Sequence, residues 1–463
     1  MTHSDGTDRS WVNQIHQGDA AETLAEMPGS SVHMAMTSPP YFGHRDYGVD
    51  GQVGLENSLD EYIDELLDVA EELRRVLRDD SSWWLNLGDS FAGSGGAGGQ
   101  WGENERGTAT RRADPGEAYN GPLKQSSFQR KTKMLIPHRV AIALEDAGWI
   151  VRADAVWYKP NGMPSSAHDR LNEQKEFLFH LTPGPQYWSD LDAIREPHAE
   201  SSLKRAGRHD HAERGFPGND HTLDPAQFCH SNGKNPGDVL EVTVGQFPEA
   251  HFAVYPENLC ETPIKFTCPP EVCARCGAPY EHVTEEIEAW KVDDPARDQL
   301  RRAQEIADEV GLTEDHFEAI LAYGWNDTEQ GQTRIRARLN DDETLELAEE
   351  AKEVLGGYFR EFTTTFERSL GYKQACDCDT VKTVPGIVLD PFSGAGTTCK
   401  VAKDLGRRFI GIDLNPEYVA MSQKRVGVTV DEPELLLDDD AQQTLLQADG
   451  GRNSRSVDTE ADR

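Results

Sequence analysis

Residues 387–398 read IVLDPFSGAGTT, and this stretch decides the fold class. An apolar strand runs into a glycine turn, and a helix-compatible segment follows as far as Leu405. A second strand, at residues 408–413, ends in Asp413, 23 positions after Asp390. Glycines let the backbone approach a ligand closely, and an acid at the tip of the second strand accepts ribose hydroxyls. The spacing therefore predicts a βαβ nucleotide site. The alternative is a glycine turn in some other α/β protein.

A second motif lies near the N-terminus, where a short buried strand predicted at residues 32–36 is followed by Thr37-Ser38-Pro39-Pro40-Tyr41-Phe42. Two consecutive prolines fix φ and remove two N–H donors, while their carbonyls stay free as acceptors. A serine acceptor, rigid carbonyls and an aromatic ring suit a flat heterocycle that bears an exocyclic amine. Taken alone, the stretch fits an ordinary proline-stiffened loop equally well.

Together the two motifs resemble those of the amino-methylating DNA methyltransferases that use S-adenosylmethionine (SAM). The catalytic motif comes first and the SAM motif last, as in the circularly permuted β group of that family. Further similar stretches lie at residues 83–90, 157–161, 176–180 and 250–256. The resemblance implies an α/β fold with a Rossmann-like, circularly permuted methyltransferase sheet. Strands predicted at residues 150–158, 176–181 and 187–190 would form the far half of this sheet. The apolar spacing also predicts an amphipathic helix at residues 59–77.

The resemblance also assigns roles to the catalytic motif. A base inside a duplex is out of reach, so the target must be flipped out into a pocket. Acceptors on both hydrogens of the amine localise its lone pair, and Ser38 Oγ with the Pro39 carbonyl is the natural pair. Tyr41 offers a face on which the base can stack. The predicted catalytic residues are Ser38, Pro39, Pro40 and Tyr41.

For SAM, the resemblance implies that Asp390 and the backbone of residues 392–396 hold the methionine moiety, and that Asp413 holds the ribose. Asp19 follows a predicted strand at residues 11–16 and would lie near the adenine. An N-cap for a helix at residues 20–27 explains Asp19 equally well, and both roles can coexist. The predicted SAM-binding residues are Asp19, Asp390, Phe392, Gly394, Gly396, Thr397 and Asp413.

Serine in the first position of the catalytic motif favours cytosine N4 as the methyl acceptor, because relatives with Asp there usually modify adenine N6. The expected partner is double-stranded DNA with a short specific site, and the halophile enzymes of similar appearance suggest CTAG. A separately encoded restriction nuclease is a further partner that the resemblance allows. Adenine N6 methylation and an inactive, zinc-bearing DNA-binding protein are the alternatives. RNA or protein substrates are disfavoured by the permuted motif order.

The chain carries 82 acidic and 46 basic residues among 463, a formal net charge of −36. DNA-binding proteins usually carry the opposite sign. Either the chain is an acidic interaction protein, or it comes from a cell with high internal salt, where surface carboxylates keep proteins hydrated and salt screens their repulsion. We favour the second reading. Residues 281–370 alone hold 24 acidic and 10 basic residues, so much of the acidity lies away from both motifs.

Location follows from what the sequence lacks. No run of 18 apolar residues occurs, and residues 1–9 are polar without a hydrophobic signal core. The sequence predicts a cytoplasmic protein with no membrane partner. Eight cysteines in a chain of this size do not indicate a disulfide scaffold.

Four of the cysteines form two close pairs, which predicts a structural zinc site. Tetrahedral zinc takes four soft ligands, and a Cys-x₂-Cys pair followed by Gly277 is a typical knuckle. The second pair has one intervening residue, which weakens the spacing argument, but relatives of this subfamily have similar pairs beside the SAM motif. Cys268 could replace one ligand. The predicted ligands are Cys273, Cys276, Cys376 and Cys378.

The domain organisation follows from these assignments. Residues 10–198 form the catalytic half of the methyltransferase domain, and residues 236–280 with 371–430 form the SAM-binding half with the cysteine element. Residues 199–235 are poor in apolar residues and include Lys204, Arg205, Arg208 and Arg214, which predicts a target-recognition loop. The alternative is disorder or a halophilic insertion. A polar loop at residues 90–130 is a second candidate for contact with DNA. The remaining parts are a disordered start at 1–9, an acidic helical insertion at 281–370, and an acidic disordered tail at 431–463.

Overall fold

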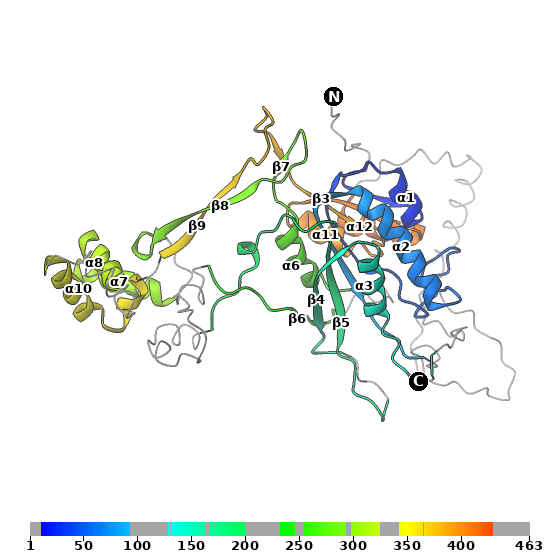
Figure 1. The fold of residues 1–463 in the computed structure, drawn as a ribbon, viewed down its shortest axis with the longest axis horizontal. Coiled ribbons are helices and arrows are strands. Elements are labelled where there is room, and N and C mark those ends of the chain that lie inside the picture. Colours follow the sequence, from blue (N-terminus) through cyan, green and yellow to red (C-terminus); the bar gives the residue numbers. More distant parts are fainter. Residues whose placement is uncertain are drawn as a thin grey trace, which may run out of the picture.

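Short, mostly buried strands build a central mixed sheet with helices on both faces (Figure 1). The computed structural model describes residues 11–92, 128–129, 131–162, 164, 167–199, 232–245, 254–292, 298–324, 342–363 and 365–428. Most of the loop predicted at 90–130, nearly all of the predicted recognition loop at 199–235, and the segments 1–9 and 431–463 lie outside these residues.

The central sheet has eight strands in the order β1-β12-β11-β2-β3-β5-β4-β6. Neighbours from β1 to β3 run parallel, β5 runs antiparallel to both β3 and β4, and β6 is parallel to β4. The strands are β1 Gln14–Gln17, β2 Val32–Thr37, β3 Leu77–Leu87, β4 Ile150–Tyr158, β5 Lys175–Thr182, β6 Val239–Glu241, β11 Ile387–Asp390 and β12 Arg408–Asp413.

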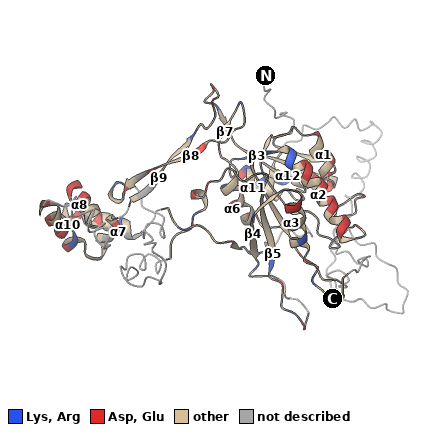
Figure 2. Ribbon diagram, viewed as in Figure 1, with Lys and Arg blue, Asp and Glu red and all other residues tan. Residues whose placement is uncertain are grey.

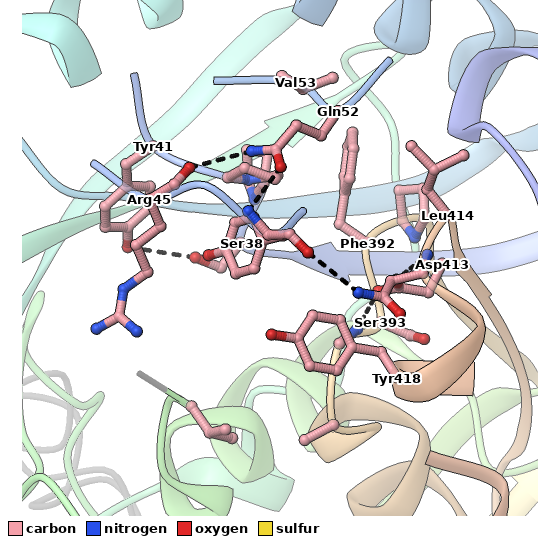
Figure 3. A pocket seen from close by; sticks show the side chains of 18 of the residues that line it. Ser38, Tyr41, Arg45, Gln52, Val53, Phe392, Ser393, Asp413, Leu414 and Tyr418 are labelled. Carbon is pink, nitrogen blue, oxygen red and sulfur yellow. Dashed lines mark hydrogen bonds between the residues drawn. The ribbon is translucent and has the colours of Figure 1, made fainter. Parts of the chain in front are cut away.

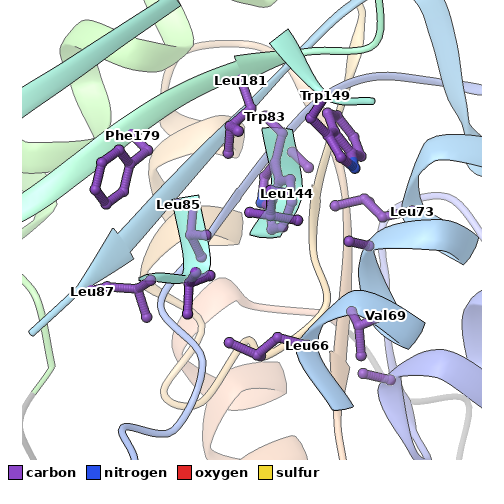
Figure 4. Packing of buried hydrophobic residues seen from close by; sticks show 14 of the residues in the cluster. Leu66, Val69, Leu73, Trp83, Leu85, Leu87, Leu144, Trp149, Phe179 and Leu181 are labelled. Carbon is purple, nitrogen blue, oxygen red and sulfur yellow. The ribbon is translucent and has the colours of Figure 1, made fainter. Parts of the chain in front are cut away.

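Successive strand residues point to opposite faces of the sheet, and each face has its own core. On β11, Ile387 and Leu389 pack on one side and Val388 on the other. The first face is covered by α1 Ala20–Glu26, α2 Leu59–Val76 and α3 Ile136–Asp146. Figure 4 shows Trp83, Leu85 and Leu87 of β3 against the leucine and valine side chains of α2. The second face is covered by α6 Glu257–Thr267, α11 Thr397–Asp404 and α12 Pro416–Val426.

The pairing of β2 with β11 joins the two sequence motifs. Val388 lies opposite Met34 and Leu389 opposite Ala35, in parallel register. Parallel strands end at the same edge of a sheet, so the loops after β2 and β11 lie side by side although some 350 residues separate them.

Outside this body lies the arm, residues 281–373. Its base is an antiparallel ribbon of β8 Glu281–Glu288 and β9 Thr365–Lys373, which carries a helical unit at its far end (Figure 1). The unit contains α7 Asp298–Val310, α8 Glu314–Gly324, α10 Asp342–Leu355 and η5 Gly356–Phe362, packed around a small apolar core of its own. Figure 2 marks many Asp and Glu positions, in red, along the ribbons of the arm helices.

Between the arm and the body lies the knuckle, residues 272–280 and 374–384. It contains the two-stranded pair of β7 Val272–Cys273 and β10 Thr383–Val384. Two short 3-10 turns complete the elements, η1 Asp192–Ile194 and η3 Ala289–Lys291.

Most predicted strands and helices are confirmed, but two expectations about elements need correction. Residues 187–190, predicted as a strand beside β5, form no strand because both edges of β5 are already paired with β3 and β4. Pro183 and Pro185 also remove backbone donors just before that segment. The insertion at 281–370 is not purely helical, since its two ends pair as the β8–β9 ribbon.

Candidate active site

A cavity of about 260 Å³ lies at the carboxyl ends of β1, β2, β11 and β12. This is the edge at which open α/β sheets bind ligands. Figure 3 shows Ser38 and Tyr41 on one side of the cavity, with Phe392, Asp413 and Tyr418 on the other. The predicted site residues that line it are Asp19, Ser38, Pro39, Pro40, Tyr41, Phe392, Gly394, Thr397 and Asp413.

The loop after β11 forms one wall of the cavity, and its glycines adopt left-handed conformations. Gly394 has φ 50°, and its N–H donates to Asp413 Oδ2 at 2.8 Å. Gly396 has φ 74° and does not line the cavity. A Cβ at Gly396 would lie 2.2 Å from Ser422 Oγ, so only glycine lets α12 pack this close to the start of α11.

Asp413 ends β12 and is bonded to backbone on both oxygens, since Asn415 N donates to its Oδ1 at 2.9 Å. Burial raises its pKa to about 6. An ionised carboxylate has about four acceptor positions, so Asp413 can still accept ligand hydroxyls from the cavity. Ser393 Oγ also belongs to this wall. It is buried and has no hydrogen-bond partner within the described part of the chain.

Asp390, predicted to hold the methionine moiety of SAM, lies apart from the cavity surface. It is fully buried and is not among the cavity-lining residues. Thr37 Oγ1 donates to its Oδ1 at 2.7 Å, and Tyr255 hydroxyl donates to its Oδ2 at 3.0 Å. The carboxylate thus joins the ends of β2 and β11 beneath the cavity. Its action on a ligand would be indirect, through the position of these strands and of Phe392, whose N–H it also accepts at 3.1 Å.

Asp19 caps a helix and also lies in the cavity wall. Its side chain accepts from Glu22 N at 3.0 Å and so caps α1, and the same residue lines the cavity. An N-cap carboxylate satisfies one open N–H of the first helical turn.

On the opposite wall, the catalytic motif is held from below by two tyrosine hydroxyls. Tyr62 donates to the Pro40 carbonyl at 3.0 Å. Tyr41 turns its hydroxyl towards Glu176 Oε2 at 2.9 Å and Asn86 Oδ1 at 3.1 Å, and Ser38 Oγ donates to it at 3.2 Å. A Cβ at Gly88 would lie 2.5 Å from Tyr41 Cε2, so the Tyr41 ring packs closely against the Gly88 backbone.

Three cavity residues, on β3, directly after β4 and on β5, received no individual role from the sequence. They are Asn86, Lys159 and Glu176, and all three line the cavity beside Tyr41. Lys159 is bonded to Glu176 and lies over the Trp157 ring, with Nζ 4.0 Å from the ring centroid. A charged residue near the start of the apolar run at 177–181 was the available signal for Glu176. Its partner Tyr41, in the loop after β2, is however 135 positions away.

The four predicted metal ligands come together in the knuckle. The Sγ atoms of Cys273, Cys276, Cys376 and Cys378 all lie within 4.8 Å of one another. Four sulfurs that are each about 2.3 Å from one zinc ion would be this close, so the cluster fits a tetrahedral site. Cys268 is buried in the second core together with Cys260 and Cys399 and does not belong to the cluster.

The knuckle lies against the amino-terminal edge of the sheet, opposite the cavity. His33 near the start of β2 accepts from Ile387 N at 3.1 Å through Nδ1, so its Nε2 carries the hydrogen and donates to the Gly277 carbonyl at 2.9 Å. Arg78 donates to the Cys276 carbonyl at 3.3 Å. This position is that of a structural element, since none of the four cysteines lines the cavity.

Two cations of the predicted 90–130 loop region are occupied by carboxylates. Lys131 pairs with Asp169 and Lys133 with Glu173, each at 2.5 Å. They can still face a DNA backbone only in competition with these partners. As for membranes, the described residues include no helix with the length and apolarity needed to cross a bilayer.

Comparison with known proteins agrees with this geometry. The sequence profile of the N6_N4_Mtase family, described as DNA methylase, matches residues 32–272 and 381–424. The chain is 30% identical over 453 residues to the Type II methyltransferase M.SfiI of Streptomyces fimbriatus, covering 91% of this chain and 93% of that protein. It is 35% identical over 246 residues to M.Cfr9I of Citrobacter freundii, covering 53% of this chain and 69% of that protein.

Among solved structures, a PvuII DNA methyltransferase (cytosine-N4-specific) is similar at 15% sequence identity and a TM-score of 0.41. The match covers 89% of this chain and 85% of that one.

Proposed function

Because this chain belongs to the N6/N4 DNA methylase family, we propose that it transfers the methyl group of SAM to the N4 amine of a cytosine flipped out of duplex DNA. The observation that carries the proposal is the place of Ser38. Its Oγ shares one cavity with the glycine loop after β11 and with Asp413. A methyl donor and an amine held by Ser38 would therefore meet in that cavity.

The chain's own residues fit SAM. Asp413 offers acceptor positions for ribose hydroxyls, and Ser393 Oγ is a buried polar atom that a ligand could satisfy. The backbone of Phe392 and Gly394 would hold the methionine part, with Thr397 at the start of α11 and Asp19 towards the adenine. SAM supplies an electrophilic methyl group on a sulfonium.

The catalytic motif would prepare the amine. Ser38 Oγ and the Pro39 carbonyl accept its two hydrogens, which favours a pyramidal nitrogen with a localised lone pair as positive charge develops. The Pro40 carbonyl is already used by Tyr62, which leaves Pro39 as the rigid carbonyl of the pair. Tyr41 lines the cavity, and the flipped base would stack on its ring.

Serine at the first motif position supports cytosine as the target. Adenine N6 is the second candidate, because the family includes both activities by name. The order of β2 before β11 in the chain supports assignment to the circularly permuted group. We further propose that a restriction nuclease of the same specificity is encoded separately.

We also propose that the knuckle holds one structural zinc through its four cysteines, and that the acidic surface is an adaptation to high internal salt. The first proposal is supported by the sulfur cluster and by its distance from the cavity. The second is supported by the net charge of −36. If it is correct, lowering KCl from about 2 M to 0.1 M lengthens the Debye length several-fold and lowers the unfolding temperature.

Mapping of modified bases tests the proposed activity. The gene is expressed in a host that lacks DNA methylation, and the host DNA is read by single-molecule sequencing with and without it. We expect N4-methylcytosine at one short palindrome, with CTAG as the candidate. Modification confined to adenine would move the assignment to N6, and unmodified DNA despite active-site integrity and SAM binding would contradict the proposal.

A further inference from the structure

A hydrogen-bonded chain runs beneath the predicted base pocket from Ser38 to Glu176. Ser38 Oγ lies 3.2 Å from the Tyr41 hydroxyl, which lies 2.9 Å from Glu176 Oε2. This series of hydrogen bonds joins the loop after β2 to the start of β5. Its far end is only partly exposed, with 18% of the Glu176 side chain accessible.

The acceptors at the buried end, Glu176 and Asn86, fix the direction of each hydrogen bond in this series. Glu176 pairs with Lys159 through its other oxygen, and an ionised carboxylate can only accept. Asn86 Nδ2 donates to the Phe177 carbonyl at 3.1 Å, so the atom that Asn86 turns to Tyr41 is its Oδ1, a second acceptor.

The Tyr41 hydroxyl therefore has one proton and two neighbouring acceptors, so it must donate to Glu176 or Asn86. Burial and the Glu176 carboxylate raise the pKa of Tyr41 well above its usual value, so that proton stays in place. The Tyr41 oxygen can then interact with Ser38 only as an acceptor. The Ser38 hydroxyl donates its single proton to the Tyr41 oxygen, so only lone pairs of Ser38 Oγ face the cavity.

We infer that Glu176, with Asn86, is a positioning residue that holds Ser38 Oγ as an obligate acceptor, so that the pocket selects a base with an amino group and rejects one with a carbonyl at the same place. The inference rests on the proposed function in requiring that this pocket receives the flipped base. Uracil, the deamination product of cytosine, would set its O4 against the Ser38 lone pairs and leave both oxygens unsatisfied. The same logic separates adenine from hypoxanthine.

The test measures binding and needs no methyl transfer. Duplexes carrying the mapped recognition sequence are prepared with cytosine or uracil at the target position, opposite an abasic site so that neither base is paired. Affinities are measured by fluorescence anisotropy without SAM. We expect the wild-type protein to prefer cytosine by about tenfold, the size of an unsatisfied buried polar contact. For an adenine target, adenine and hypoxanthine replace the pair.

Two variants test the contribution of the hydrogen bonds between Ser38, Tyr41 and Glu176. Tyr41→Phe releases the Ser38 proton, so the hydroxyl can donate to uracil and the preference should fall to within about twofold of unity. Glu176→Gln should give an intermediate ratio, because Asn86 still accepts from Tyr41. Tyr62→Phe is the matched control: it removes a tyrosine hydroxyl from the other end of the same motif and should keep the wild-type ratio.

The outcomes separate the inference from the proposed activity. Equal binding of cytosine and uracil by a wild-type protein that methylates DNA overturns the inference alone, even if Tyr41→Phe does not fold. A preference that survives in folded Tyr41→Phe also overturns it. Absence of site-specific binding to either duplex overturns the proposed function and the inference together.

Discussion

The body and the arm are built differently, and the cavity is formed by residues of the body. The body buries two extended apolar cores, one on each face of its sheet, and its strand ends form the cavity. The arm has one small core and a strongly acidic sequence. Within the described residues, the cavity takes no side chain from between Tyr255 and Pro391. The pocket is thus assembled without the arm.

The comparison with known families divides the chain at the same place. The DNA methylase profile stops at residue 272 and resumes at 381, so the arm and all four cysteines of the knuckle lie outside it. The knuckle closes the excursion at its base, because one pair of cysteines precedes the arm and the other follows it. Its contacts through His33 and Arg78 attach the excursion to the edge of the sheet away from the cavity.

The largest effect is expected in the body. Ser38→Ala removes the side-chain acceptor for the amine and should lower the methylation rate about 100- to 1,000-fold, the usual loss for one preorganised polar contact. SAM affinity by calorimetry should stay within about twofold, since Ser38 belongs to the base side of the cavity. Ser81→Ala, a buried serine on β3 outside the cavity, is the control. Equal losses in both variants would break the assignment.

The next prediction concerns SAM binding and pH. Asp413 has a pKa raised to about 6, so it is ionised above that pH and protonated below it. Ribose hydroxyls need the ionised acceptor, so SAM affinity should be about tenfold weaker at pH 5 than at pH 7. Asp413→Asn should weaken binding and remove this dependence, whereas Asp19→Asn should keep it. A flat profile in the wild-type protein would refute the role given to Asp413.

Loss of the proposed zinc should destabilise the knuckle and leave SAM binding in the cavity unchanged. Cys276→Ser removes one of four ligands, so the zinc content by mass spectrometry should fall from one per chain to near zero and the unfolding temperature should drop. SAM affinity at 25 °C should change by less than about twofold, because the knuckle lies at the opposite edge of the sheet. Cys268→Ser is the contrast, since it should lower stability through the core and keep the zinc. Zinc retained in Cys276→Ser would contradict the site.

The smallest effect is expected from removing the helical unit. Glu288 and Thr365 lie opposite each other in the ribbon, so an Asn-Gly turn can join them and preserve the β8–β9 pairing. SAM affinity should remain within about threefold of the full chain. Loss of SAM binding in a folded variant would show that the body depends on the arm. Retained SAM binding with lost DNA binding would instead give the arm a role with DNA.

What the sequence predicted well was local. The strand at residues 408–413 follows from a short apolar run and the helix from residue 59 from a period of 3.6, and both are present. The cavity residues from the motifs at 37–42 and 387–398 also lie close together, because the carboxyl ends of parallel strands share an edge.

What it missed depends on distant partners. Glu176 meets Tyr41 across 135 positions, and only the antiparallel placement of β5 beside β3 brings them together. The ribbon was missed because β8 reads EHVTEEIE, whose charges disguise a strand that pairs with residues some 80 positions later. Asp390 was assigned to the ligand because its motif suggested it, whereas its burial depends on Thr37 and Tyr255 from other parts of the chain.

The central claim is that the body of this chain methylates an amino group on DNA, at cytosine N4, through Ser38. The most direct measurement incubates purified protein with unmethylated DNA and deuterium-labelled SAM in molar KCl, digests the DNA to nucleosides and identifies the labelled one by mass spectrometry. We predict labelled N4-methyldeoxycytidine with the wild-type protein and none with Ser38→Ala. Label found only in N6-methyldeoxyadenosine, or equal label with Ser38→Ala, would contradict the account.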